Sequence, residues 1–377
     1  MLPVLAVVAA FYAVMVPVRI HQHGTLWFAH VGRAFLRSAH TSPALDSVRS
    51  SESEFGYDGQ FYFFIATDPE HARDYMHIGS EDQSAIRYAR IVYPGLSFLL
   101  SAGQPGAVPA AMLALNLLAI GGGTWAVALW LRRRGRSPWF AALYGLWPGM
   151  IFAVFRDLSE PLAYCFAAFA LLVFSRRRPW AGAALLALSL LTRETTVGFV
   201  LALALAIALS DRLRSVLFAA TAVLPMLVWR VVLTAWFDLT TLEHTGSGLK
   251  VVLPFYGMYS RYPFDWQHWL LVWTVYIPLL LAGVGGLYLL ARRRELDLAL
   301  LLLVNVALFV VFLPKNVTID WGAAARNATP ALLAAIYCAP AVRSRLVLLV
   351  GALALSPLWY LFVAYLLDAP GWRFMTT

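Results

Sequence analysis

The residues of this sequence that could do chemistry are charged side chains at the edges of long apolar runs. The first is Asp58, which lies between Gly56 and Gly59 in the segment GYDGQ and is followed by the aromatic stretch FYFFIATD. A carboxylate followed by such a stretch is typical of a helix that lies at a membrane surface. The glycines would let the backbone approach a ligand closely. The alternative is a surface turn in which Asp58 only caps the helix.

Three later groups of charged residues fall between apolar runs. They are Arg156 with Asp157 and Glu160, Arg193 with Glu194, and Lys315 with Asp320 and Arg326. Charge within or beside a membrane is costly, so each group needs a reason. Arg156 and Glu160 could pair across one helical turn, or they could line the mouth of a cavity. Arg326 is predicted at the start of a helix, where the dipole does not favour a cation. We therefore expect it to bind an anion such as a phosphate.

No metal, cofactor or nucleotide site is expected. The histidines show no HExxH spacing, and the sequence has no P-loop, GxGxxG or GxSxG element. The two cysteines, Cys165 and Cys338, lie inside apolar runs. Their number and placement exclude a disulfide framework and a thiolate metal site.

The elements that carry these residues are predicted to be membrane spans. Hydrophobic residues make up 61% of the 377 and charged residues only 13%, which is about half the charged share of a soluble domain. The net charge is +9, and short arginine clusters lie between apolar runs at residues 132–136, 176–178, 212–214, 292–294 and 343–345. Short basic connectors of this kind mark the cytoplasmic side of a membrane protein. They predict a lipid bilayer, and not a nucleic acid, as the partner.

With about 20 residues per crossing, the apolar runs predict an all-α polytopic membrane protein with about eleven transmembrane helices in a single domain, residues 1–377. The spans are predicted at 2–18, 107–131, 139–156, 158–175, 179–193, 196–210, 215–236, 268–291, 297–313, 326–341 and 346–367. If residue 1 starts inside, all five basic connectors lie inside. Residues 19–90 then form a long external loop with interfacial helices, and residues 237–267 a second external loop. Residues 91–104 are apolar but too short to cross.

Several short motifs occur in the order in which a known family has them. They are YDGQFY at 57–62 with Ile65 and Ala66, RIVYPG at 90–95, SEPL at 159–162, TRET at 192–195, and Arg326 with Pro330. In order and spacing the sequence resembles the GT-C class of membrane glycosyltransferases, in particular the bacterial relatives of the dolichyl-phosphate-mannose-dependent mannosyltransferases. Tyr57 stands where that family usually has Trp, and Gly95 where it commonly has Leu.

The resemblance implies the transfer of a sugar, such as mannose or another hexose, from a polyprenyl-phosphate-linked donor to an acceptor hydroxyl. The acceptor would be a glycan, a lipid or a protein in cell-surface glycan or glycopolymer assembly. Transfer would invert the anomeric centre, without a metal. The implied location is the inner membrane of a bacterium, with the active site facing the periplasm.

The resemblance also implies roles for individual residues. Asp58 would be the general base, which accepts the proton of the acceptor hydroxyl. The donor phosphate would be bound by Arg326, Arg193 and Arg156, because the planar fork of arginine can pair with two phosphate oxygens. The residues expected to bind the acceptor or to support the others are Tyr57, Gln60, Tyr62, Asp68, Asp157, Glu160 and Glu194.

The main alternative is a transporter or a flippase for a lipid-linked sugar. Such proteins place functional charges near the middle of the bilayer and often consist of repeated halves. Here the charged groups gather toward one predicted face, and the sequence shows no internal repeat. A different membrane transferase and a catalytically silent assembly factor are further alternatives. The silent factor predicts that substitution of Asp58 leaves function intact.

Overall fold

The structure, a computed structural model, describes residues 1–38, 45, 54–74, 76–78, 81–82, 84–176, 178–237, 256, 266–312, 321–342 and 344–357. The described elements are helices, apart from one short antiparallel ribbon in which β1 (His77–Ile78) pairs with β2 (Glu81–Asp82). The predicted all-α fold is confirmed for these residues. The predicted second external loop, residues 237–267, falls almost wholly outside them, as do Lys315, Asp320 and the end of the last predicted span.

Four helical runs are long and apolar enough to cross a bilayer. They are α1 (Leu2–His23), α6 (Val108–Arg133) with the 3-10 turn η4 (Pro105–Ala107) before it, α12 (Arg212–Trp236), and α14 (Trp266–Leu271) continued by the π-helical turn η8 (Val272–Tyr276) and α15 (Ile277–Ala291). Each coincides with a predicted span. On α12 large apolar side chains such as Leu213 and Val228 are mostly exposed. An apolar surface of this kind suits lipid, and the chain is a membrane protein.

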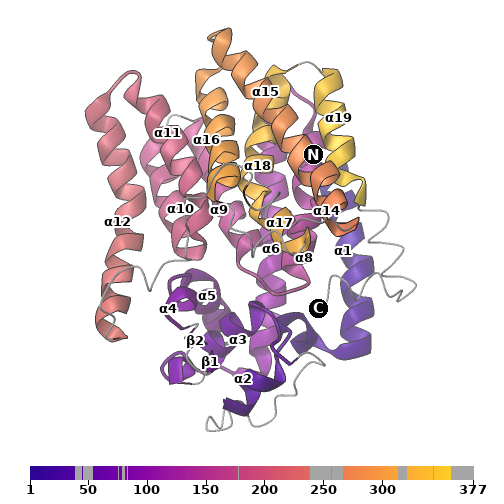
Figure 1. Cartoon of the computed structure of the whole chain (residues 1–377), viewed down its shortest axis with the longest axis vertical. Helices are drawn as coiled ribbons and strands as arrows, with labels where there is room; N and C mark the ends of the chain where they lie inside the picture. Colours follow the sequence, from indigo (N-terminus) through magenta and orange to yellow (C-terminus); the bar gives the residue numbers. More distant parts are fainter. Residues whose placement is uncertain are drawn as a thin grey trace.

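Shorter apolar helices complete the bundle in Figure 1. They are α9 (Glu160–Phe174), α10 (Pro179–Thr192), α11 (Val197–Ala208), α16 (Leu296–Phe312), α18 (Thr329–Cys338) and α19 (Ser344–Leu355). Helix α9 packs against α6 and α10, and α11 packs against α16. The Ser189 hydroxyl of α10 donates to the Ala163 carbonyl of α9 over 2.7 Å, so the two helices approach closely.

The span predicted at 139–156 is not one helix. It consists of the 3-10 turn η5 (Pro138–Ala141), α7 (Ala142–Gly145) and α8 (Pro148–Val154). The break precedes Pro148, which has no N–H to give to a preceding turn and which favours extended angles in the residue before it. Trp147 accordingly has φ −59° and ψ 125°.

The span predicted at 326–341 is broken as well. It begins earlier, with α17 (Trp321–Asn327), and continues through α18 to the 3-10 turn η10 (Ala339–Ala341). The Trp147 indole joins the two breaks, because its Nε1 donates to the Ala325 carbonyl over 3.1 Å and also lies 3.2 Å from the Thr329 hydroxyl. A Cβ on Gly149 would clash with that same carbonyl. Glycine thus lets α8 and α17 approach closely.

The segment between α1 and α6 lies at one end of the bundle, the lower end in Figure 1. It contains the 3-10 turn η1 (Thr25–Ala29), α2 (Arg33–Ser38), α3 (Gly59–Thr67), the 3-10 turn η3 (Ala72–Asp74), α4 (Ser84–Tyr88) and α5 (Val92–Leu100). Every residue of α3 is buried. Helix α5 covers only about 13 Å at 1.5 Å per residue, so it is too short to cross, as predicted.

The opposite end of the bundle carries basic connectors. Arg132, at the end of α6, approaches the sulfur of Met1 at 3.8 Å. Arg134 pairs with Glu295, between α15 and α16, over 2.6 Å. Figure 1 shows the α11–α12 and α15–α16 connections at its upper end. The N-terminus and these connectors therefore share one end, which is the arrangement that the predicted sidedness requires.

A cysteine placed at each end tests this arrangement. Asp74 has a side chain 60% exposed at the lower end, and Arg294 is exposed in the α15–α16 connector. We expect Asp74→Cys and Arg294→Cys to react with a membrane-impermeant maleimide from opposite sides of the membrane, in intact cells and in inverted vesicles. The native cysteines are both buried and provide an unreactive background. Labelling of both variants from the same side would contradict the arrangement.

Candidate functional site

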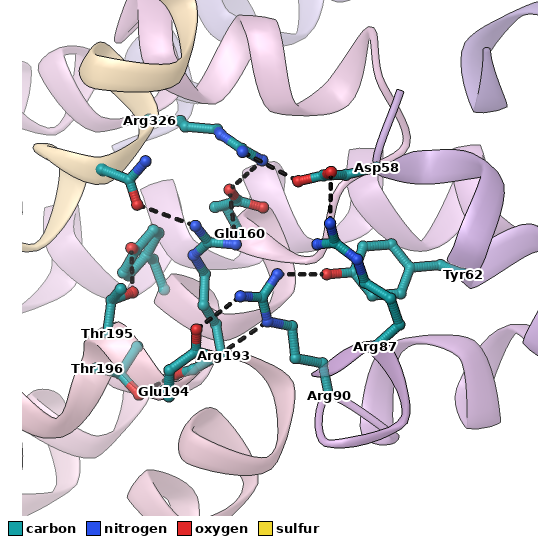
Figure 2. Close-up of polar contacts among 12 residues, drawn as sticks. Asp58, Tyr62, Arg87, Arg90, Glu160, Arg193, Glu194, Thr195, Thr196 and Arg326 are labelled. Carbon is teal, nitrogen blue, oxygen red and sulfur yellow. Dashed lines mark hydrogen bonds and ion pairs between the residues drawn. The ribbon is translucent and has the colours of Figure 1, made fainter. Parts of the chain in front are cut away.

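Asp58 lies at the start of α3, where two arginines hold its carboxylate (Figure 2). Arg87 Nη2 donates to Oδ1 over 2.8 Å, and Arg326 Nη2 donates to Oδ2 over 3.0 Å. Asp58 occupies the N-cap position of α3, but its side chain makes no capping hydrogen bond. The interpretation of Asp58 as the cap of a surface turn is therefore wrong.

Glu160, the first residue of α9, is fully buried and lies beside the same arginine. Its Oε1 accepts a hydrogen bond from Arg326 Nη1 over 3.2 Å and lies 3.0 Å from Arg193 Nη1. Its Oε2 has no hydrogen-bond partner within the described residues. Arg193 Nη2 also donates to Asn327 Oδ1 over 3.0 Å. Arg326 thus bridges two carboxylates that lie about a hundred residues apart in the chain.

A second ion pair lies next to the first group in Figure 2. Arg90 donates to Glu194 through two bonds, from Nε to Oε2 over 2.9 Å and from Nη2 to Oε1 over 2.6 Å. Its Nη1 donates to the Tyr62 hydroxyl over 2.9 Å. Both partners of this ion pair are buried. The predicted supporting residues Tyr62 and Glu194 therefore both accept hydrogen bonds from Arg90. We call the seven charged side chains the charged cluster: Asp58, Arg87, Arg90, Glu160, Arg193, Glu194 and Arg326.

Helix ends and breaks position the charged cluster. Glu160 starts α9, where the helix dipole favours a carboxylate. Arg193 has extended backbone angles at the break between α10 and the 3-10 turn η6 (Glu194–Thr196), which separates the two short predicted spans. Arg326 lies near the end of α17, where the dipole favours a cation. The prediction that Arg326 lies at the start of a helix is therefore wrong. The helix dipole gives no reason to expect an anion at Arg326.

Gly59 explains how the segment between α1 and α6 packs against the bundle. A Cβ at this position would clash with the carbonyl oxygen of Arg156. Only glycine lets the start of α3 lie directly against the turn between α8 and α9. The glycines beside Asp58 were expected to let the backbone approach a ligand. Gly59 instead lets it approach the backbone of Arg156, and this contact brings Asp58 close to Glu160.

Aromatic rings border the charged cluster beside Arg156. The Arg156 Cζ lies 5.0 Å from the ring centroid of Tyr57 and 5.5 Å from that of Phe152. The Arg326 Cζ lies 5.5 Å from the same Tyr57 ring. Contacts at these distances are cation–π interactions. The structure thus places Arg156 and Tyr57 at the edge of the site.

Within the part of the chain that the structure describes, the charged cluster gathers more arginines than carboxylates. Its four arginines face three carboxylates, and Arg156 adds a further positive charge at the edge. Burial alone would raise the pKa of Asp58, but Arg87, Arg326 and Arg90 together hold it well below its ordinary value of 3.8. Asp58 is therefore ionised at neutral pH. A buried group of arginines favours the binding of an anion.

Three of the predicted site residues, Gln60, Asp68 and Asp157, neither belong to the charged cluster nor border it. The Gln60 amide bonds the Gly32 N–H over 2.9 Å and the Phe55 carbonyl over 2.8 Å, and so fixes the loop before α3. Asp68 lies at the opposite end of α3 from Asp58. Asp157 is buried with a left-handed φ of 45°.

Asp157 belongs to a separate polar group behind the site. Its Oδ1 lies 3.4 Å from Asn116 Nδ2, and the same amide donates to the Tyr93 hydroxyl over 2.7 Å. Burial raises the pKa of Asp157 well above its ordinary range, against the lowering effect of its hydrogen bonds with Asn116 and Tyr93. These contacts tie the α8–α9 turn to α5 and α6.

Two residues of the charged cluster, Arg87 and Arg90, were not predicted as site residues. Arg90 begins one of the quoted motifs, RIVYPG, and Arg87 lies three residues earlier. Their spacing of one helical turn was a signal that they face the same way. Their partners, Asp58 and Glu194, come from other segments and could not be assigned from spacing.

The described residues offer no group of three or more His, Cys, Asp or Glu side chains that could hold a metal ion. Each carboxylate of the charged cluster already contacts at least one arginine. The site as it stands is therefore suited to anions.

Comparisons with known proteins give no match: no family model, no curated protein and no solved structure is similar to this chain. We therefore infer the function from the site itself and from the motifs of the sequence.

The Arg90–Glu194 pair allows a test of the charged cluster as a folding element. Glu194→Gln would leave Arg90 buried without its counterion, which costs about 3–5 kcal/mol in comparable pairs. Unfolding in mixed detergent micelles measures this loss. Glu54→Gln is the matched control, because Glu54 is 39% exposed and pairs with Arg33 and Arg37 at the surface. It should change stability by less than about 1 kcal/mol. Equal effects of the two variants would contradict a structural role for the buried pair.

Proposed function

We propose that this protein is a GT-C type glycosyltransferase that moves a sugar, such as mannose or another hexose, from a polyprenyl phosphate to an acceptor hydroxyl. One observation carries the proposal: an ionised carboxylate, Asp58, is held directly by two arginines of a buried charged group. A base next to an anion site is what sugar transfer from a phosphate carrier requires. The order of the motifs supports the same family.

The arginines would bind the phosphate of the donor. Arg326 has the side-chain fork for two phosphate oxygens, and in the structure that fork is shared between Asp58 and Glu160. When the donor binds, Arg326 would turn from these carboxylates to the phosphate, with Arg193 and Arg156 beside it. Loss of this contact would raise the pKa of Asp58 toward its ordinary value and make it a stronger base.

The reaction would be a single displacement. The acceptor oxygen attacks the anomeric carbon while the bond from that carbon to the phosphate oxygen breaks, and Asp58 takes the hydroxyl proton. The polyprenyl phosphate leaves with the bonding electrons, and the arginines stabilise the negative charge that develops on it. Attack from the face opposite the leaving group inverts the anomeric centre.

The place of the site in the membrane suits a lipid-linked donor. The polyprenyl chain would remain in the bilayer while its phosphate reaches the surface. We propose about eleven crossings of a bacterial inner membrane, with the basic connectors in the cytoplasm. The charged cluster lies in the half of the bundle away from these connectors, so the site would face the periplasm. Cell-surface glycan or glycopolymer assembly takes place there.

A direct test compares wild type with Asp58→Asn in nanodiscs. Each receives a panel of radiolabelled polyprenyl-phosphate sugars, with membrane extract as the source of acceptor. Wild type should transfer label from at least one donor, and Asp58→Asn should lose about 10²–10⁴-fold of the rate, as loss of a general base does. Asp74→Asn, an exposed aspartate of the same external segment, should retain the wild-type rate. Unchanged transfer by Asp58→Asn would remove the base assignment, and no transfer by wild type from any donor would point to transport.

A further inference from the structure

A cavity of about 450 Å³ lies between the end of α3 and the start of α5. Its volume falls within the range of about 300–1,000 Å³ that is common for small-ligand sites. One wall is apolar and includes Ile91, Pro94 and Phe98, with Gly95 between the last two. The other wall carries polar side chains from the end of α3 and the turn after it.

Gly95 leaves this cavity open. A Cβ at this position would meet no heavy atom within 4 Å, although the residue lies inside the helix α5. Glycine is an unfavourable residue in a helix by about 1 kcal/mol relative to alanine. Close packing against a neighbouring segment does not require glycine at position 95, because the space beside this residue is part of the cavity.

The polar wall is acidic. It includes Asp68, Glu70, His71 and Thr67. His71 Nδ1 lies 3.0 Å from Asp68 Oδ1, and this contact raises the pKa of His71. Thr67 also belongs to this wall and is 7% exposed.

The cavity and the charged cluster share two pieces of the chain. Ile65, on the cavity wall, lies seven residues after Asp58 and hence about 10 Å away along α3. Ile91 follows Arg90, whose guanidinium bonds Tyr62 and Glu194 in the charged cluster. A ligand several sugar units long has the length to reach from the cavity to Asp58.

We propose that this cavity binds an uncharged saccharide unit of the acceptor, remote from the hydroxyl that reacts. Carboxylates accept hydrogen bonds from sugar hydroxyls, and Phe98 offers an apolar face to the C–H side of a sugar ring. The same carboxylates repel phosphate, so the donor phosphate belongs at the arginines and the neutral chain belongs here. The proposal rests on the proposed function, and it names an oligosaccharide as the class of acceptor.

Gly95→Leu tests the cavity, because leucine would fill the space and is the better helix former. The probes are uncharged disaccharides (mannobiose, cellobiose, maltose and gentiobiose) and, as an anion, glucose 6-phosphate. Saturation-transfer NMR measures their binding to the whole protein in nanodiscs. We expect wild type to bind at least one disaccharide and Gly95→Leu to bind it at least fivefold more weakly. Asp68→Asn, which keeps the shape of the wall, should also weaken binding.

Gly121→Leu is the matched control. Gly121 is likewise a helical glycine, in α6, and a Cβ added there would meet no heavy atom within 4 Å, so the variant should bind the disaccharide as wild type does. The cavity assignment is overturned if wild type binds no disaccharide, if Gly95→Leu binds as wild type does, or if glucose 6-phosphate binds equally well. The assay needs neither donor nor catalysis, so it is independent of the transfer experiment. Binding at the cavity with no transfer by wild type would overturn the proposed function and leave a saccharide site.

Discussion

The bridge that Arg326 makes between Asp58 and Glu160 is the interaction on which the rest of the site depends. It joins the start of α3, the start of α9 and the end of α17 through one guanidinium group. None of these charges is stable alone in a membrane protein, because a buried charge without a partner is costly. Each segment therefore holds the others in place, and the helix breaks lie where their polar ends can meet.

The breaks are as important as the helices. Pro148 interrupts the apolar run that follows α6, and Trp147 then bonds the junction of α17 and α18. Arg193 and Glu194 occupy another interruption, between α10 and α11. A continuous helix at these positions would satisfy its own backbone hydrogen bonds. Interrupted helices instead place charged side chains at one level of the bundle, where a phosphate at the membrane surface could reach them.

Much of this organisation was predictable from the sequence, since apolar length and the arginine connectors indicate helices and their sides. Asp58, Glu160, Arg193 and Arg326 were predicted to face one region, and the structure brings them together. The pairings were not predictable, because they depend on how distant segments pack. Arg87 and Arg90 were therefore missed, and Gln60 and Asp68 were grouped with Asp58 although one bonds the backbone and the other lies at the far end of α3. The helix break before Pro148 was missed because the residues around it have the apolar composition of a continuous span.

The arginines of the charged cluster are inferred to bind the phosphate of a lipid carrier, and the proposed function stands on this contact. The most direct measurement compares the binding of decaprenyl phosphate and of decaprenol, which lacks the phosphate, to wild type and to Arg326→Ala in nanodiscs. A lost charge-assisted contact is worth about 1.5–3 kcal/mol, so the variant should bind the phosphate roughly 10- to 100-fold more weakly and the alcohol unchanged. Equal binding of the phosphate by both proteins would show that Arg326 does not hold the carrier.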